Sequence, residues 1–399
     1  MRANSITVVI PARNDGEFLN TLLAAINNQT VLPHEIVIID SSTNTGVKVY
    51  VEECIETVPI IYQTEKKAYP GRARNIGIDL ANKEWIAFLD CKTVPEKDWL
   101  ERYQHLIQAY NADVVIGVTQ FQAKTPFQKI LQAATYGKIG HHTVPGTLIS
   151  KQAFHDSGGF LEHVRMGEDI EWRERLIKNG LNIHWPEEPI VTYTGLPGNF
   201  LITVKKYFTS AYHTARLNIL RNMKDLYLSL LLILSAIVLP KWNYIIGGWD
   251  KNILFIPHVT KIYLLSLISF LLIYLLVRLL FFRKRIETLF IRSLKLMIFL
   301  LLSLAVYRWN AVIAGWVEDA VFYIPHITKM YLGILLGASI IYRGIVLPLR
   351  RDINPRFLFP IKWIKIGLLG LSIDLIKSPG YLYGAVIFGL RNYFVKNNE

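Results

Sequence analysis

Cysteine is scarce in this 399-residue chain, which contains only Cys54 and Cys91. No CxxC pair is present, so neither a disulfide framework nor a structural zinc site is supported. The N-terminus leads straight into a strand-like run, without the charged segment, apolar core and cleavage site of a signal peptide. We therefore expect the N-terminal half to stay in the cytoplasm. Four histidines of that half also lack zinc-ligand spacing: His141, His142, His155 and His163.

Acidic residues are scarce in the C-terminal half. Residues 1–200 contain 19 Lys and Arg against 23 Asp and Glu, whereas residues 201–399 contain 25 against 8. The net charge of +13 therefore arises entirely in the half that also holds the long apolar runs. This distribution is typical of basic residues beside anionic lipid and argues against a nucleic-acid partner.

Apolar runs long enough to span a bilayer fill much of residues 225–399 and predict an all-α transmembrane domain of helical hairpins there. Repeated Trp, Gly and Ile-Pro-His motifs place the hairpins at about 226–282 and 293–349. Residues 361–377 and 380–395 contain charges and are either two more spans or interfacial helices, which leaves four or six spans. Arginine-rich loops orient the protein in the plasma or inner membrane with its N-terminal domain in the cytoplasm.

Residues 201–224 connect the two halves. Apolar residues recur there at steps of three and four, and Lys, Arg and His occupy much of the remainder. This pattern predicts a basic amphipathic helix in the headgroup layer, or else an ordinary surface helix of the first domain. Arg343 falls inside an apolar run, and we expect it to snorkel to the interface or to hold a lipid phosphate.

Strand-like and helix-like segments alternate over residues 1–200. Alternation of this kind predicts a largely parallel α/β sheet covered on both faces. Ligands of such sheets bind at the carboxyl ends of the strands, where Asp40 and Asp90 both fall. The β-rich runs are Ile6–Ile10, Glu35–Asp40, Trp85–Leu89 and Asp113–Gly117.

Five motifs in a fixed order give this region a family resemblance. They are Val9–Asn14, Glu35–Thr43, Gly71–Gly77, Trp85–Asp90, and Gly158–Phe160 followed by Gly167–Trp172. In this order they resemble the family 2 glycosyltransferases over about residues 5–215. The resemblance implies a GT-A fold, Rossmann-like with a mostly parallel sheet, in residues 1–200, and a nucleotide-sugar donor.

A nucleotide-sugar donor needs a carboxylate at a strand end to bind its base or ribose, and Asp40 fits this role; the alternative is an Asp that caps a turn. The resemblance places Asp90 near the ribose or diphosphate. Arg72 and Arg74 could pair with the diphosphate, or could be solvated residues at the start of a helix. The remaining predicted donor-binding residues are Pro11, Arg13, Asn14 and Lys92.

An inverting transfer needs a general base for the acceptor hydroxyl. Asp169 matches the acidic residue of the family's ED motif, which implies that it is this base with Glu168 beside it. The alternative is that either residue merely caps the following helix. The resemblance also puts Gly159 and Trp172 at the acceptor site.

The sequence departs from the family at Lys92. Where a DxD motif would end on a second carboxylate for Mg²⁺ or Mn²⁺, the chain reads Asp90-Cys91-Lys92. The resemblance makes a metal at Asp90 possible, and the lysine weakens that prediction. Our hypothesis is that the Lys92 ammonium does part of the metal's work at the diphosphate.

These observations favour an enzyme that adds one sugar to a lipid-linked or membrane-proximal acceptor. A processive polysaccharide synthase is the enzyme alternative, but residues 200–221 lack the QxxRW motif of that class. A non-catalytic glycosyltransferase-like membrane scaffold is the third possibility, and Lys92 is its best argument.

Overall fold

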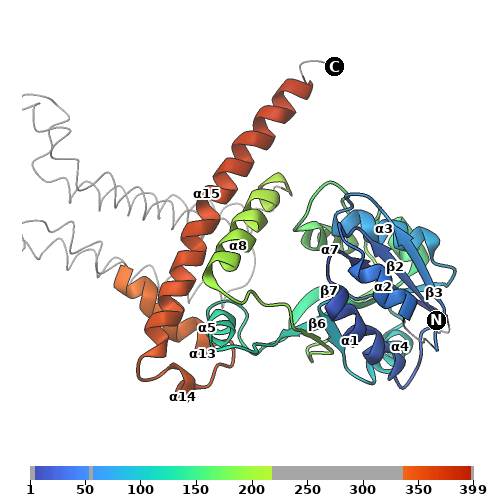
Figure 1. Cartoon of the computed structure of the whole chain (residues 1–399), viewed down its shortest axis with the longest axis horizontal. Helices are drawn as coiled ribbons and strands as arrows, with labels where there is room; N and C mark the ends of the chain where they lie inside the picture. The colour runs from blue at the N-terminus through green and yellow to red at the C-terminus, as the bar shows by residue number, and fades with distance from the viewer. Residues whose placement is uncertain (1–4, 54–56, 218–335, 397–399) are drawn as a thin grey trace, which may run out of the picture. The chain divides into compact units, whose positions relative to one another are not determined.

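The computed structural model describes residues 5–53, 57–217 and 336–396 (Figure 1). Its contacts divide the chain into two compact units, residues 1–227 with 340–399, and residues 228–339. Almost all described residues belong to the first unit. The predicted hairpins at 226–282 and 293–349 therefore lie outside the described residues, apart from the last residues of the second one.

A nine-stranded sheet forms the centre of the N-terminal domain, with the order β3-β2-β1-β4-β7-β6-β9-β5 and with β8 paired to β6. The first four strands in this order are parallel, and β7 runs antiparallel to both of its neighbours. The predicted α/β class is confirmed for this region, with a mixed sheet. The strands are β1 Ile6–Ala12, β2 Glu35–Asp40, β3 Ile60–Thr64, β4 Trp85–Phe88, β5 Thr93–Pro95, β6 Val114–Phe121, β7 His141–Ser150, β8 Ile183–His184 and β9 Val191–Tyr193.

Helices cover both faces of this sheet. Because side chains alternate along a strand, Val8 and Ile10 pack into one apolar cluster while Val9 packs into the other. The first cluster lies under α1 and α4, and the second lies under α3 and α7, whose Trp172 is fully buried there. The helices are α1 Gly16–Asn27, α2 Gly46–Glu53, α3 Pro70–Leu80, α4 Trp99–Tyr110, α5 Pro126–Thr135, α6 Lys151–Asp156 and α7 Glu168–Lys178.

A helical layer follows, in which α8 packs against the C-terminal helix α15. The described part of the predicted amphipathic helix 201–224 forms α8, Phe200–Thr214, and a 3-10 turn to Leu217, and residues 218–224 lie outside the described residues. A third apolar cluster joins α5 and α8 to the C-terminal segment and includes Leu131, Tyr207 and Ile366. The C-terminal elements are η3 Tyr342–Val346, α13 Leu347–Leu349, α14 Pro355–Leu358 and α15 Lys362–Lys396.

Helix α15 is continuous where the sequence predicted two segments, 361–377 and 380–395. Pro379 lies inside it, and the helix continues because packing against α8 outweighs the local cost of proline. Gly380 and Gly384 allow this close packing, since a Cβ at Gly384 would lie 2.4 Å from the Tyr212 carbonyl oxygen. Among the helices that the structure describes, none has both the length and the apolar character needed to cross a membrane.

Arg343 is an ion-paired residue, which corrects the prediction that it snorkels or holds a lipid phosphate. Its side chain is buried, and its Nε and one terminal nitrogen lie 2.8 and 2.7 Å from Oδ2 of Asp374 on α15. A charge in an apolar helix is stabilised by the nearest opposite charge, and the fold supplies that charge from a helix 31 residues away. Sequence periodicity alone could not pair the two residues.

Substitution of Gly384 tests the packing of α15 on α8. We expect Gly384→Ala to lower the free energy of unfolding by about 1–3 kcal/mol, because the new methyl group clashes with backbone that cannot move aside. Thermal unfolding of the purified chain measures the effect. Gly198→Ala is the control, since a Cβ there meets nothing within 4 Å. Equal melting temperatures for the two variants would show that α15 does not depend on this contact.

Candidate active site

The carboxyl ends of β1, β2 and β4 meet at one edge of the sheet. Ala12 at the end of β1 pairs with Asp40 at the end of β2, and Val9 pairs with Phe88 near the end of β4. Asp40 and Asp90 therefore lie on either side of β1, as the parallel arrangement required. This edge is where α/β proteins bind their ligands.

Asp40 organises the loop that follows β2. Its side chain is buried, one carboxylate oxygen accepts from the Ser42 N–H at 2.8 Å, and the other accepts from the Tyr62 hydroxyl at 2.8 Å. Burial, together with this hydrogen bond and the negative charge of Asp40, raises the pKa of Tyr62. The contacts of Asp40 are thus those of a turn-capping residue, and its role toward the donor stays a prediction.

Asn14 joins the loops after β1 and β2. It adopts a left-handed conformation with φ 57°, which Asn tolerates better than most residues. Its N–H donates to the Ser42 hydroxyl at 2.7 Å, and its side-chain oxygen accepts from the Thr43 N–H at 2.9 Å. Arg13 is exposed beside it, and the Pro11 carbonyl accepts from the Cys91 thiol. The predicted donor residues Pro11, Arg13 and Asn14 thus line the same edge as Asp40.

Arg74 lies buried at the centre of the site. Its guanidinium donates to Asp90 at 2.8 Å and to Glu168 at 3.0 Å, and so ties α3 to the loop after β4 and to the start of α7. This burial contradicts the solvated position that the sequence allowed, and the diphosphate contact stays a prediction. Arg74 is buried because it shares the buried face of α3 with Ala73 and Gly77.

Arg72 lies on the opposite, exposed side of the same helix. Its guanidinium pairs with Glu65 at 3.0 Å and approaches Glu162 at 4.0 Å. Nearly half of the side chain is accessible to solvent, so these surface pairs add little stability. The solvated alternative therefore describes Arg72 in this structure.

Glu168 is a buried carboxyl group whose charge is only partly compensated. Burial raises its pKa to about 7, although Arg74 acts in the opposite direction. Within the described residues, the second Glu168 oxygen and the Arg74 Nε are buried without a hydrogen-bond partner. One guanidinium thus serves two carboxylates, which leaves Glu168 able to exist as a neutral acid near neutral pH.

Asp169 is half-buried in the first turn of α7, next to Glu168. The helix begins after Gly167, and neither acid acts as its N-cap. Within the part of the chain that the structure describes, the Asp169 carboxylate forms no hydrogen bond or ion pair. A carboxylate that is accessible and unpaired at this edge of the sheet can accept a proton from a bound hydroxyl group.

The predicted acceptor contacts of Trp172 and Gly159 are not supported by their surroundings. The Trp172 indole is fully buried, donates to the Ser157 hydroxyl at 3.1 Å and packs on Phe160 with ring centroids 4.6 Å apart. Gly159 forms a turn with φ 69°, and its carbonyl accepts from Arg175. Trp172 lies in the core because the apolar face of α7 points into the sheet, whereas Gly159 belongs to the segment between α6 and α7.

Lys92 lies on the loop after β4, where its ammonium pairs with Asp15 at 2.7 Å. The carboxylate donors at this edge do not fit a divalent cation. One Asp90 oxygen is taken by Arg74, the next side chain of the motif is a cation, and the described residues hold no cluster of three or more His, Cys, Asp or Glu arranged for a metal. Mg²⁺ is held by one or two carboxylates together with substrate phosphates, and the Lys92 ammonium at this point would repel it.

The sequence did not indicate three features of this site: Asp15, Tyr62 and the role of Arg74 as a central ion-pair partner. Asp15 follows Pro11–Asn14 directly, so extending the first motif by one residue would have found it. Tyr62 has no such signal, since its contact with Asp40 depends on the pairing of β2 with β3.

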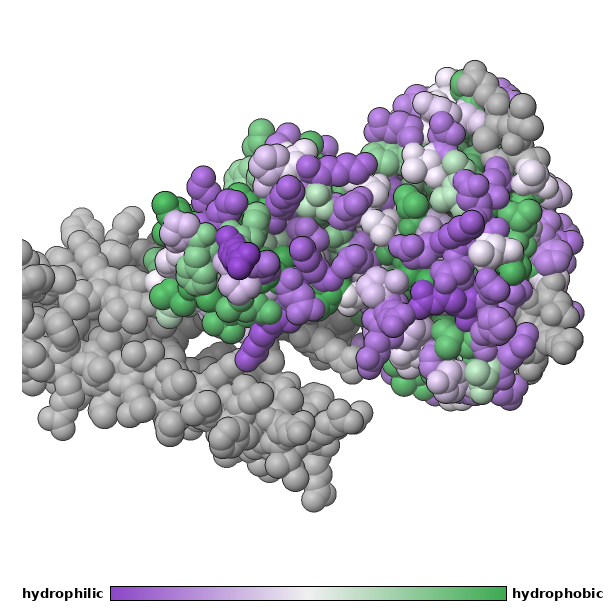
Figure 2. Space-filling model, turned by 90° about the horizontal axis from the view of Figure 1, so that it is seen from below, coloured by the Kyte–Doolittle hydropathy of each residue, from purple (hydrophilic) through white to green (hydrophobic). Residues whose placement is uncertain are grey.

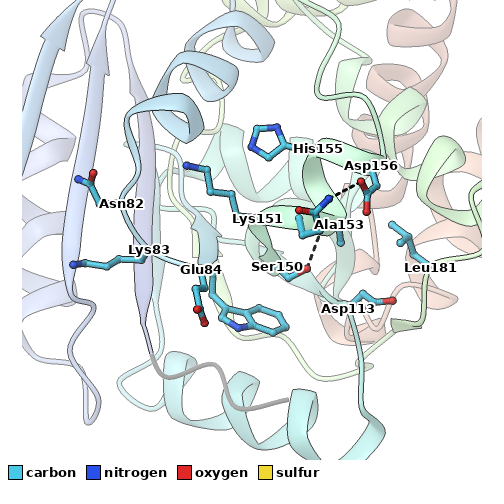
Figure 3. Close-up of a pocket in the computed structure, with 12 residues that line it drawn as sticks. Asn82, Lys83, Glu84, Asp113, Ser150, Lys151, Ala153, His155, Asp156 and Leu181 are labelled. Carbon is cyan, nitrogen blue, oxygen red and sulfur yellow. Dashed lines mark hydrogen bonds between the residues drawn. The ribbon is translucent and has the colours of Figure 1, made fainter.

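A separate cavity of about 770 Å³ lies at the other end of β4 (Figure 3). Figure 3 shows Asn82, Lys83 and Glu84 on one side and His155 and Asp156 on the other. The cavity adjoins Trp85, the first residue of β4, whereas donors are expected at the carboxyl ends of parallel strands. We therefore assign the active site to the edge that carries Asp40 and Asp90.

Comparison with known proteins gives the class of this protein. Residues 7–160 match the model of "Glycosyl transferase family 2", so the chain carries a domain of that family. Among curated proteins, glycosyltransferase AglE of Haloferax volcanii is 24% identical over 217 residues, which is 51% of this chain and 70% of AglE. Glycosyltransferase GlyG of Streptococcus pneumoniae is 32% identical over 120 residues, which is 28% of this chain and 38% of GlyG. The matches identify the chain as a glycosyltransferase.

The comparison of structures finds TarS of S. aureus, solved with UDP-GlcNAc, with a TM-score of 0.41 and 18% identity. The match covers 54% of this chain and 67% of that structure.

Removal of the central guanidinium tests its role. We expect Arg74→Met to lower the free energy of unfolding by about 3–5 kcal/mol, because two carboxylates would be left without their cation. Chemical denaturation measures the effect. Arg72→Met is the matched control and should change stability by less than about 1 kcal/mol. Similar losses in both variants would contradict the structural role assigned to Arg74.

The pH dependence of stability tests the environment of Glu168. Because its folded-state pKa is about 7 and the ordinary value is 4.5, the folded state binds the proton more tightly, and stability falls as pH rises from about 4.5 to about 7. We expect Glu168→Gln to remove up to about 3 kcal/mol of this fall. Denaturation at pH 4.5 and pH 7.5 compares it with wild type and with Glu171→Gln. A parallel pH profile for Glu168→Gln and wild type would show that folding does not raise the pKa of Glu168.

Proposed function

We propose that this chain is an inverting glycosyltransferase that moves one sugar from a nucleotide-sugar donor to a lipid-linked or membrane-proximal acceptor in glycan or polysaccharide synthesis. The observation that carries this proposal is the unpaired, accessible carboxylate of Asp169 beside the Asp90–Arg74–Glu168 ion pairs. The family match supports the reaction class.

The reaction requires one proton transfer and one displacement. The acceptor hydroxyl oxygen attacks the anomeric carbon as its proton passes to the Asp169 carboxylate. The bond from that carbon to the diphosphate breaks, and its electron pair leaves with the nucleoside diphosphate. Attack from the face opposite the leaving group inverts the anomeric configuration.

The donor occupies the edge formed by β1, β2 and β4 in this proposal. The loops joined by Asn14 and Ser42 are fixed before a ligand arrives, which reduces the entropy lost on binding. The Asp40 carboxylate binds the base or ribose by exchanging one of its present partners. Arg13 is exposed directly after the end of β1, and in this proposal its guanidinium contacts a phosphate of the donor.

Association with a membrane is the second part of the proposal. Basic Lys205 and Lys206 on α8 follow exposed Phe200, Leu201 and Ile202. Figure 2 shows hydrophilic residues over much of the α/β domain, and larger apolar areas over the helical layer. Basic and apolar side chains together suit an anionic bilayer surface, and the apolar runs of residues 228–335 favour anchoring in the plasma or inner membrane with the catalytic domain in the cytoplasm.

Two other functions can be weighed against this proposal. A processive synthase would also use Asp169 as base, but the absence of a QxxRW motif from residues 200–221 disfavours it. A non-catalytic scaffold would need no free carboxylate at the site. The intact set of Asp40, Asp90 and Asp169 therefore favours an enzyme over a scaffold.

Substitution of Asp169 tests the proposal. We expect Asp169→Asn to reduce donor turnover by about 10²–10⁴-fold, the usual contribution of a general base. The measurement is nucleotide release from UDP-, GDP- and dTDP-sugars by the full-length protein in membrane lipid extract. Asp79→Asn, an exposed acid on α3, is the matched control and should retain wild-type turnover. Equal turnover by both variants would remove Asp169 from the reaction.

A further inference from the structure

The loop between β4 and β5 presents Asp90 and Lys92 from one rigid turn. The Thr93 hydroxyl accepts from the Asp90 N–H at 3.1 Å and donates to the Asp90 carbonyl at 2.6 Å. The Thr93 N–H donates to the same carbonyl at 2.9 Å. The turn therefore holds the carboxylate and the ammonium in fixed positions at the carboxyl edge of the sheet.

The Lys92 side chain is directed along that edge by its neighbours. Its stem crosses Gly195, where a Cβ would come within 2.4 Å of the Lys92 Cδ, so a larger residue there would displace the lysine. The ammonium lies 2.7 Å from an Asp15 oxygen and 5.2 Å from the centroid of the Phe18 ring. These contacts keep the positive charge next to the ends of β1 and β4.

Asp15 occupies the N-cap position of α1 without acting as a cap. An Asp at this position normally accepts a hydrogen bond from the second or third N–H of the helix. Within the described residues the Asp15 side chain makes no such bond, and its carboxylate contacts Lys92 instead. Both side chains remain partly open to solvent, at 23% and 31%, so an anion from solution can reach the ammonium.

We propose that Asp15 is an exchangeable partner of Lys92. Its carboxylate holds the Lys92 ammonium in place until the diphosphate of a nucleotide-sugar replaces it as the ion-pair partner. The inference rests on the proposed function and adds the source of positive charge at the leaving group. Lys92 then stabilises the nucleoside diphosphate as the sugar departs. In this proposal the Lys92 ammonium replaces a divalent cation at the diphosphate. This agrees with the side chains at this edge, which do not fit such a cation.

Competition between two anions for one ammonium has a measurable consequence. Removal of the Asp15 charge frees Lys92 and should tighten nucleoside diphosphate binding, whereas removal of the Lys92 charge should weaken it. The two effects must be coupled, because Asp15 acts through Lys92 and is a positioning residue. Simple repulsion between Asp15 and the diphosphate would instead persist without the lysine.

The experiment measures the dissociation constants of UDP, GDP and dTDP for the full-length protein in lipid nanodiscs with excess EDTA, by calorimetry. We expect Asp15→Asn to tighten binding about tenfold and Lys92→Met to weaken it about tenfold or more, the effect of one charge-assisted hydrogen bond. In the Lys92→Met background, Asp15→Asn should change affinity less than twofold. Lys92→Arg should retain binding and so show that the site is intact.

Glu17→Gln is the matched control for Asp15→Asn, because Glu17 is an exposed acid two residues along the chain that takes no part in the proposed exchange. Lys97→Met is the control for Lys92→Met, because Lys97 is an exposed lysine away from this edge, where its carbonyl accepts from the Thr30 N–H. An equal effect of Asp15→Asn with and without Lys92 would overturn the exchange, as would weaker binding in the single variant. Binding that is lost in EDTA and restored by Mn²⁺ would overturn the role of Lys92 as the cation. Absence of binding for every nucleotide with the wild-type protein would overturn the proposed function itself and this inference with it.

Discussion

The buried guanidinium of Arg74 is the interaction on which the site depends. It joins α3, the loop after β4 and the first turn of α7, and so sets the positions of Asp90 and Glu168. One cation between two carboxylates leaves a partly uncompensated negative charge, which burial turns into a raised pKa for Glu168. A buried charge in this arrangement fixes geometry more than it adds stability, because desolvation offsets much of the attraction.

The two cations of the site, Arg74 and Lys92, have different roles. Arg74 is buried and pairs with two carboxylates, whereas Lys92 is partly exposed and pairs with one carboxylate among the described residues. A fully engaged guanidinium holds the framework rigid, and a flexible ammonium with one partner can transfer to a ligand. The proposed chemistry therefore places structural and ligand-binding charge on different residues of one edge.

Part of this site follows from the sequence because it depends on local order. The alternation of strands and helices over residues 1–200 predicts the α/β class and a parallel sheet. In such a sheet Asp40 and Asp90 lie at the same edge, because each follows or ends a strand. The motifs also indicated Asn14 and Lys92 as residues of that edge. The acceptor roles of Trp172 and Gly159 stay predictions without support from their surroundings, because a motif records residue types in order, not which face of α7 or of a turn each one occupies.

Three features were decided only by tertiary structure. Arg74 is buried because α3 turns that face toward the sheet, and its partners come from 16 and 94 residues away in the sequence. Arg343 pairs with Asp374 because the fold brings their two helices together. Helix α15 continues through Pro379 because packing against α8 outweighs the low helix propensity of proline. The sequence alone determined the strand-and-helix alternation, the acids at the strand ends and the lysine in the DxD position, since these depend on neighbours in the chain. Which charges meet depended on contacts that exist only once the sheet and helices have packed.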